Sequence, residues 1–277
     1  MAHENAKARV NLWLRSERAM GVGNLLPRPK AIEPSESAPA ESAPSEESDE
    51  QAPAMGLFRG EEVAEVNKVK KSPGLPIHLP VLSLEEKRGA LAAMDVSEVR
   101  GCTRCVLCKG RTQTVFGEGD PDARVFFIGE GPGENEDETG RPFVGRAGHL
   151  LDKMIAGMGL RREDVYIANV VKCRPPGNRT PAPDEVAACA PFLVRQLEII
   201  RPKVIVTLGL PAARFMLEDI TTMGRARGQW RSWRGIKLMP TYHPSYLLRS
   251  YTEENRQAVW NDLKAVMAEL GLPVRGK

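Results

Sequence analysis

The sequence predicts an α/β fold of three layers, α/β/α, in which helices cover both faces of a central, mostly parallel, four-stranded sheet. Short apolar runs, such as residues 125–128 and 204–208, alternate along the chain with longer stretches of helical periodicity. These runs contain almost no polar residues, which is typical of parallel strands buried on both faces. Glycines, prolines and polar residues follow the runs, and in such sheets the loops beyond the strands' carboxyl ends bind ligands.

The elements follow one another in a regular order. Order begins near Leu82, where Ser83 can cap a helix that runs to about residue 96. Apolar residues at helical spacing predict a helix over residues 145–160. Further helices are expected at residues 183–200, from Pro211 onward and at residues 253–270, and strands at residues 125–128, 165–170 and 204–208. Residues 229–233 and 236–240 read as a hairpin, while residues 129–137, 169–179, 209–211 and 241–249 are expected to be loops.

Residues 1–82 are expected to be an extension that is largely disordered. Residues 31–54 are mostly Ser, Pro, Ala and Glu, with seven acidic residues and no Lys or Arg, so they bury too little apolar surface to fold. The net charge is +3, and setting these seven charges aside raises that of the remainder to +10. A basic body suggests a polyanionic partner such as nucleic acid, although it can also be a solvated face. Residues 55–58 are either a docking motif for a replication or repair protein or, as we favour, a stray apolar cluster.

The composition excludes several protein classes. Hydrophobic residues make up 42% and charged residues 27% of the 277 positions, and no apolar run approaches the length of a membrane span. The N-terminus has no signal-peptide core, so we expect a cytoplasmic, nucleoid-associated monomer that has no membrane partner. Five cysteines without an export signal argue for reduced thiols or metal ligands rather than disulfides.

The loop after the first strand is the clearest candidate for chemistry. Gly129, Gly131 and Gly133 let the backbone approach a ligand closely, and carboxylates follow at once. A nucleotide-binding loop would instead require a lysine after its glycines. The acidic residues Glu134 and Glu136 would repel a phosphate.

Four cysteines form a second candidate site. Cys102 and Cys105 make a CxxC pair, and Cys173 and Cys189 come from elsewhere in the chain. Such a set suits a four-thiolate centre, and spacing alone does not choose between zinc and an iron–sulfur cluster. The alternative is a set of small buried hydrophobic residues. Cys108 is treated as a bystander.

Four motifs resemble those of the family 4 uracil-DNA glycosylases, which are iron–sulfur enzymes. These motifs are residues 129–133, 140–145, 169–176 and 243–249, and the resemblance covers residues 83–272. It implies a uracil-DNA glycosylase domain over residues 83–277 with a structural [4Fe–4S] cluster on Cys102, Cys105, Cys173 and Cys189. It further implies base excision repair on single- or double-stranded uracil-containing DNA, in which uracil is flipped out and its N-glycosidic bond is hydrolysed, leaving an abasic site.

The resemblance also implies roles for individual residues. Phe143 would stack on the flipped base, beside Gly129 and Gly131, and Asn169 would donate to uracil O4 and accept from N3–H. His243 would bond uracil O2 as charge develops on the leaving base. The wedge that fills the vacated stack would be Leu247, Leu248 and Arg249. Arginines 225, 227, 231 and 234, interleaved with Trp230 and Trp233, would contact phosphates or form only a solvated basic hairpin.

One departure concerns the attacking water. The family 1 enzymes carry an Asp that positions this water and a Tyr that blocks the methyl group of thymine. This chain has Gly131 and Gly133 at those places, and the family 4 enzymes likewise lack that Asp and that Tyr. Glu130 and Glu136 are therefore the candidates, with Asn178 able to orient either one. We expect Glu136 near uracil C5, and Glu130 near the water. A catalytically silent iron–sulfur DNA-binding protein remains an alternative, while a covalent-trapping relative is set aside because its basic, His-containing loop is missing.

Overall fold

The computed structural model describes residues 80–217 and 219–274, and the predictions for residues 1–79 lie outside this part. One six-stranded sheet has the order β1-β3-β2-β4-β6-β5. The strands are β1 (Glu118–Gly119), β2 (Val125–Gly129), β3 (Tyr166–Asn169), β4 (Val204–Leu208), β5 (Arg231–Trp233) and β6 (Ile236–Thr241). The α-helices are α2 (Leu84–Met94), α3 (Glu134–Thr139), α4 (Arg146–Gly157), α5 (Pro183–Ile200), α6 (Leu210–Met216), α7 (Met223–Ala226), α8 (Pro244–Arg249) and α9 (Glu253–Leu270).

The inner four strands, β3, β2, β4 and β6, are all parallel. The prediction of a mostly parallel sheet is therefore confirmed, but the count of four strands is wrong. Antiparallel strands β1 and β5 add one strand at each edge. Strand β1 gives no apolar run to recognise because it has only two residues, one of them Gly119. That glycine lies so close to β3 that a Cβ there would stand 1.8 Å from the carbonyl oxygen of Val165.

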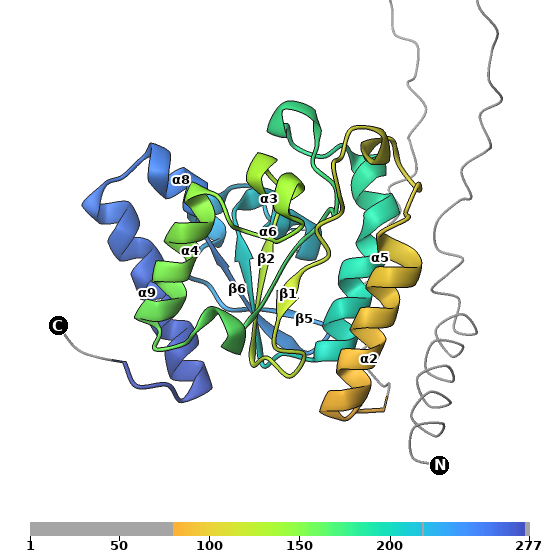
Figure 1. Cartoon of the computed structure of the whole chain (residues 1–277). Coiled ribbons are helices and arrows are strands. Elements are labelled where there is room, and N and C mark those ends of the chain that lie inside the picture. The colour runs from red at the N-terminus through yellow and green to blue at the C-terminus, as the bar shows by residue number, and fades with distance from the viewer. Residues whose placement is uncertain (1–79, 218, 275–277) are drawn as a thin grey trace, which may run out of the picture.

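Helices cover both faces of the sheet, as predicted (Figure 1). Alternate side chains of β2 point to opposite faces. Phe126 and Ile128 pack with α2 and α5 in one hydrophobic cluster. Val125 and Phe127 pack with α4 and α9 in the other. Both rows are fully buried, and this explains why the strand reads as a continuous apolar run.

Two segments that were predicted as loops contain short helices. Helix α3 lies within the acidic stretch after β2, and α8 lies within residues 241–249. Pro244 occupies the first turn of α8, where its missing N–H costs nothing, and the His243 side chain caps the helix by accepting from the backbone N–H of Ser245. Helix α2 begins at the predicted cap Ser83 and continues as one π-helical turn, Asp95–Val99, so it ends slightly later than expected.

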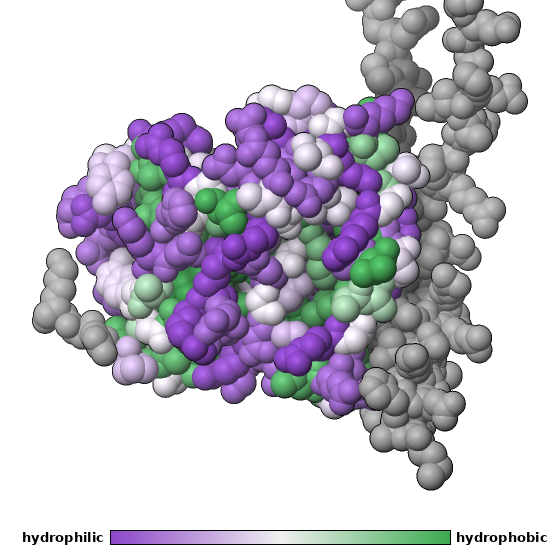
Figure 2. All heavy atoms as spheres, viewed as in Figure 1, coloured by the Kyte–Doolittle hydropathy of each residue, from purple (hydrophilic) through white to green (hydrophobic). Residues whose placement is uncertain are grey.

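Hydrophilic side chains cover most of the face seen in Figure 2, and hydrophobic ones form only small separate patches there. Within the described residues, every helix is too short or too polar to span a lipid bilayer.

Candidate functional site

A cleft of about 470 Å³ opens where the parallel strands end. The loops after β2, β3 and β6 converge on it, as the α/β architecture predicts. Nine of the residues singled out from the sequence line it, namely Glu130, Gly131, Gly133, Glu136, Phe143, Asn169, Asn178, His243 and Arg249. Sequence reasoning did not single out Arg146, Thr180 or Ser245, which also line the cleft.

Asn169 ends strand β3 and is 1% exposed. Its Oδ1 is buried and has no hydrogen-bond partner among the described residues. Gly129, at the end of the neighbouring strand, packs against this oxygen, because a Cβ at position 129 would lie 2.3 Å from it. Buried polar atoms are nearly always hydrogen-bonded, so this oxygen is suited to accept from a ligand's N–H group.

Phe143 forms a wall of the cleft. Its ring lies beside that of His243, with centroids 5.5 Å apart and planes tilted by 31°. The same ring packs on Gly129, where a Cβ would stand 2.5 Å from Cζ. Phe143 has a φ of 52°, a conformation that is rare for a residue with a side chain. Such strain persists only where the surroundings fix the backbone, and it is common at ligand-binding sites.

Glu136 fixes the backbone on one side of Phe143. Its Oε1 accepts from the N–H groups of Val144 at 2.8 Å and Gly145 at 2.9 Å. Its Oε2 accepts from the N–H of Gly133 at 3.1 Å. Three backbone donors thus hold this carboxylate, and this arrangement favours a role in shaping the turn over one in activating water.

Glu130 is the other carboxylate in the cleft. Burial raises its pKa, and a hydrogen bond from the Thr180 side chain opposes the rise. Asn178, which was expected to orient one of the two glutamates, has its Oδ1 occupied by Arg174 Nε at 2.8 Å. Asn178 is therefore at the rim of the cleft but is engaged with an arginine.

His243 lies at the end of the loop after β6. Its Nδ1 accepts from the backbone N–H of Ser245 at 3.0 Å, so the neutral ring carries its proton on Nε2. The pKa of His243 is lowered to about 4, chiefly by burial and also by the nearby charge of Arg249, while the charge of Glu136 acts in the opposite direction. The residue is therefore a neutral Nε2–H donor at physiological pH.

The structure separates the three residues of the expected wedge. Leu247 is 3% exposed and belongs to the hydrophobic cluster beneath α4 and α9. Leu248, on the same short helix, is 36% exposed, and Arg249 is exposed and lines the cleft. Only Leu248 and Arg249 can therefore reach a partner without unfolding α8.

The basic hairpin lies elsewhere. Its turn precedes β6, so Trp233 and Arg234 lie at the amino-terminal end of that parallel strand, whereas the cleft opens at the carboxyl ends of the strands. Arg234 pairs with Glu198 at 2.6 Å, and Arg227 pairs with Asp262. The hairpin turn is thus not part of this site. Exposed Arg146 and Arg249 line the cleft instead, and neither has an ion-pair partner in the part of the chain that the structure describes.

All five cysteines line one small pocket between α5 and the segment that follows α2. Two sulfurs accept hydrogen bonds, Cys173 from Arg111 Nη1 at 3.2 Å and Cys189 from the backbone N–H of Lys172 at 3.2 Å. Burial raises the pKa of Cys189 to about 12. In the described residues, no group of three or more Cys, His, Asp or Glu side chains has the arrangement of a metal-ion site.

Comparison with known proteins gives a consistent result. A family model described as the uracil DNA glycosylase superfamily matches residues 116–264. A type-4 uracil-DNA glycosylase of Thermotoga maritima is 55% identical over 172 residues, which are 61% of this chain and 90% of that protein. One of Archaeoglobus fulgidus is 46% identical over 179 residues, 62% of this chain and 89% of that protein. A type-5 uracil-DNA glycosylase of Pyrobaculum aerophilum is 36% identical over 146 residues, 47% of this chain and 64% of that protein.

Proposed function

Because the chain belongs to the uracil-DNA glycosylase superfamily, and within it to the type-4 enzymes, we propose that its cleft is the active site in which uracil is cut from DNA. The enzyme hydrolyses the N-glycosidic bond and leaves an abasic site for base excision repair. Uracil must leave the base stack to reach Asn169, which is buried in the cleft. The observation that carries the assignment of the cleft is the buried, unpaired Oδ1 of Asn169.

Asn169 and Phe143 recognise the base. Uracil N3–H donates to Oδ1 of Asn169, and the amide N–H₂ donates to uracil O4. Cytosine offers an acceptor at N3 and a donor at position 4, so both bonds would be lost and the amide would stay unpaired. Rejection of a base that leaves buried polar groups unpaired is typically strong. Phe143 stacks on the flipped ring and holds it against Asn169 and His243.

His243 stabilises the leaving group. As the glycosidic bond breaks, negative charge develops on uracil O2, and the Nε2–H of His243 donates to it. The Ser245 N–H fixes the tautomer beforehand, so no reorganisation is needed as the bond breaks. Loss of one such donor typically costs about 10²- to 10³-fold in rate.

The two glutamates divide the remaining work. Glu130 orients the attacking water, because among the described residues Thr180 alone donates a side-chain hydrogen bond to this carboxylate. Glu136 shapes the turn that presents Phe143, and through that turn it sets the space beside uracil C5. Leu248 enters the vacated stack, and Arg249 and Arg146 contact phosphates of single- or double-stranded DNA.

Cys102, Cys105, Cys173 and Cys189 would hold a [4Fe–4S] cluster. The donor set fits, since four thiols line one pocket and two sulfurs already accept hydrogen bonds, which is typical of cluster ligands. The cluster would support the fold between α2 and α5 and take no part in base removal.

The test uses an oligonucleotide with one uracil. Wild-type protein should release uracil and leave a site that alkali cleaves, while His243→Ala should be slower by about 10²-fold or more. His149→Ala, an exposed histidine outside the cleft, is the matched control and should keep the wild-type rate. Failure of wild-type protein to release uracil from any strand form would support the silent DNA-binding alternative instead.

A further inference from the structure

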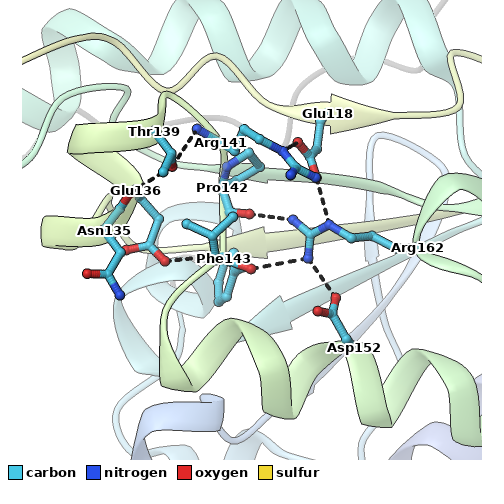
Figure 3. A network of polar contacts seen from close by, with 10 residues as sticks. Glu118, Asn135, Glu136, Thr139, Arg141, Pro142, Phe143, Asp152 and Arg162 are labelled. Atoms are coloured by element: carbon cyan, nitrogen blue, oxygen red, sulfur yellow. Dashed lines mark hydrogen bonds and ion pairs between the residues drawn. The ribbon is translucent and has the colours of Figure 1, made fainter.

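Arg162 holds the turn that carries Phe143, although it does not line the cleft. Its Nη1 donates to the carbonyl oxygen of Phe143 at 3.2 Å, and its Nη2 donates to that of Pro142. One guanidinium therefore binds two consecutive carbonyl groups. Figure 3 shows Arg162 and Glu136 on opposite sides of this turn.

Two carboxylates fix the guanidinium in place. Arg162 Nε donates to Glu118 Oε1 at 2.6 Å, and Nη1 donates to Asp152 Oδ1 at 2.7 Å (Figure 3). Glu118 is itself held by Arg141 Nε at 2.8 Å. The side chain of Arg162 is 21% exposed. Its planar fork of donors is thus oriented by β1 and α4 before it reaches the carbonyls.

The turn needs support from both sides. Phe143 has a φ of 52°, which the surroundings must enforce. Glu136 binds the N–H groups that follow Phe143, and Arg162 binds the carbonyl of Phe143 and the one before it. With the Arg162 bonds removed, the peptide can relax towards a negative φ, which swings the ring away from Gly129 and His243.

We propose that Arg162 is a positioning residue for uracil excision, acting through Phe143 by binding the carbonyl oxygens of residues 142 and 143. This inference rests on the proposed role of Phe143 as the platform for the flipped base. Its effect should appear in the rate of excision, because a displacement of about 1 Å at a reacting centre can cost roughly 10²-fold.

The experiment is a double-mutant cycle measured as single-turnover excision from a uracil-containing single strand. Arg162→Met removes the donors and keeps an apolar stem, and Phe143→Ala removes the platform. Arg161→Met is the matched control, because Arg161 is adjacent, pairs only with Glu163 and Asp164 among the described residues, and is 72% exposed. Arg162→Lys is the second variant, since one ammonium group cannot bind two carbonyls and two carboxylates together.

We expect Arg162→Met to slow excision roughly 10- to 100-fold in the wild-type background and by less than about twofold when Phe143 is already alanine. Arg162→Lys should be slow as well, and Arg161→Met should match wild type. Equal slowing by Arg162→Met in both backgrounds would overturn the inference, as would equal effects of the changes at positions 161 and 162. If Arg162→Met does not fold, the same cycle with Arg162→Lys decides in the same way.

The cycle also separates this inference from the proposed function. A fast Phe143→Ala would refute the role of the platform itself. A slow Phe143→Ala beside a fast Arg162→Met would refute only the role of Arg162.

Discussion

Gly129→Ala tests whether Asn169 and Phe143 must both stand where the structure has them. Gly129 is buried at the end of β2, between these two side chains. A Cβ at this position would lie 2.3 Å from Asn169 Oδ1, 2.5 Å from Phe143 Cζ and 2.7 Å from Cε2. An ordinary contact begins near 3.4 Å, so the two side chains must each retreat by about 1 Å.

The size of the effect follows from that displacement. Overpacking of a well-packed site costs about 1 to 3 kcal/mol of stability, which for a domain of this size lowers Tm by about 2 to 12 °C. A shift of about 1 Å in the groups that grip the base can cost roughly 10²-fold in rate. The rate should therefore fall far more than the population of folded protein at 25 °C.

The assay compares single-turnover excision rates and thermal unfolding of wild type, Gly129→Ala and Gly89→Ala. Gly89 lies within α2, and a Cβ there would have no atom within 4 Å. Gly89→Ala should keep the wild-type rate and gain about 0.5 to 1 kcal/mol of stability, because alanine suits a helix better than glycine. A wild-type excision rate in folded Gly129→Ala would refute the arrangement of the base pocket.

Two further predictions concern His243 and the cysteines. Since the pKa of His243 is about 4 in the folded protein and 6.5 as its ordinary value, the unfolded chain binds more protons between these values. Stability should therefore fall as pH drops from 6.5 towards 4, and this group should not affect it above pH 7. The urea midpoint of His243→Gln should fall less between pH 7 and pH 4.5 than that of wild type. Equal losses in the two proteins would contradict a buried, neutral imidazole. Cys105→Ser should lower bound iron and the visible absorbance of the purified protein, whereas Cys108→Ser should retain both, and a loss of iron in Cys108→Ser would show that this cysteine is a ligand.

The inner strands could be predicted from sequence because each is a short apolar run that can be recognised from its own residues. The run 204–208 contains only apolar residues and one Thr, and it forms β4 with those bounds. The loops after such strands must converge beyond the strands' carboxyl ends, so the meeting of residues 129–137, 169–179 and 241–249 at the cleft followed from the order of the elements, whereas Phe143 was found only through the resemblance. Strand β1 escaped prediction because its two residues are defined by pairing with β3 and carry no periodicity of their own.

The roles of Glu136 and Arg162 depend on contacts between distant parts of the chain. Glu136 accepts from N–H groups eight and nine residues ahead of it, at Val144 and Gly145. Arg162 binds carbonyls 20 and 19 residues before it and a carboxylate 44 residues before it. No pattern of residue spacing in the sequence predicts hydrogen bonds of this kind. Leu247 was assigned to the wedge because residues 241–249 were expected to be a loop, whereas α8 turns this side chain into the core.

The most direct test of the account is inhibition of excision by free bases with methyl groups at defined positions. The unpaired Oδ1 of Asn169 should accept from uracil N3–H, so a methyl group on N3 removes the donor and also collides with the amide. N1 is the atom that carries the sugar in DNA, and a methyl group there leaves N3–H intact. We predict that uracil and 1-methyluracil inhibit with similar constants and that 3-methyluracil inhibits at least about tenfold more weakly. Equal inhibition by 1-methyluracil and 3-methyluracil would contradict the assignment of Asn169 and of this cleft as the uracil site.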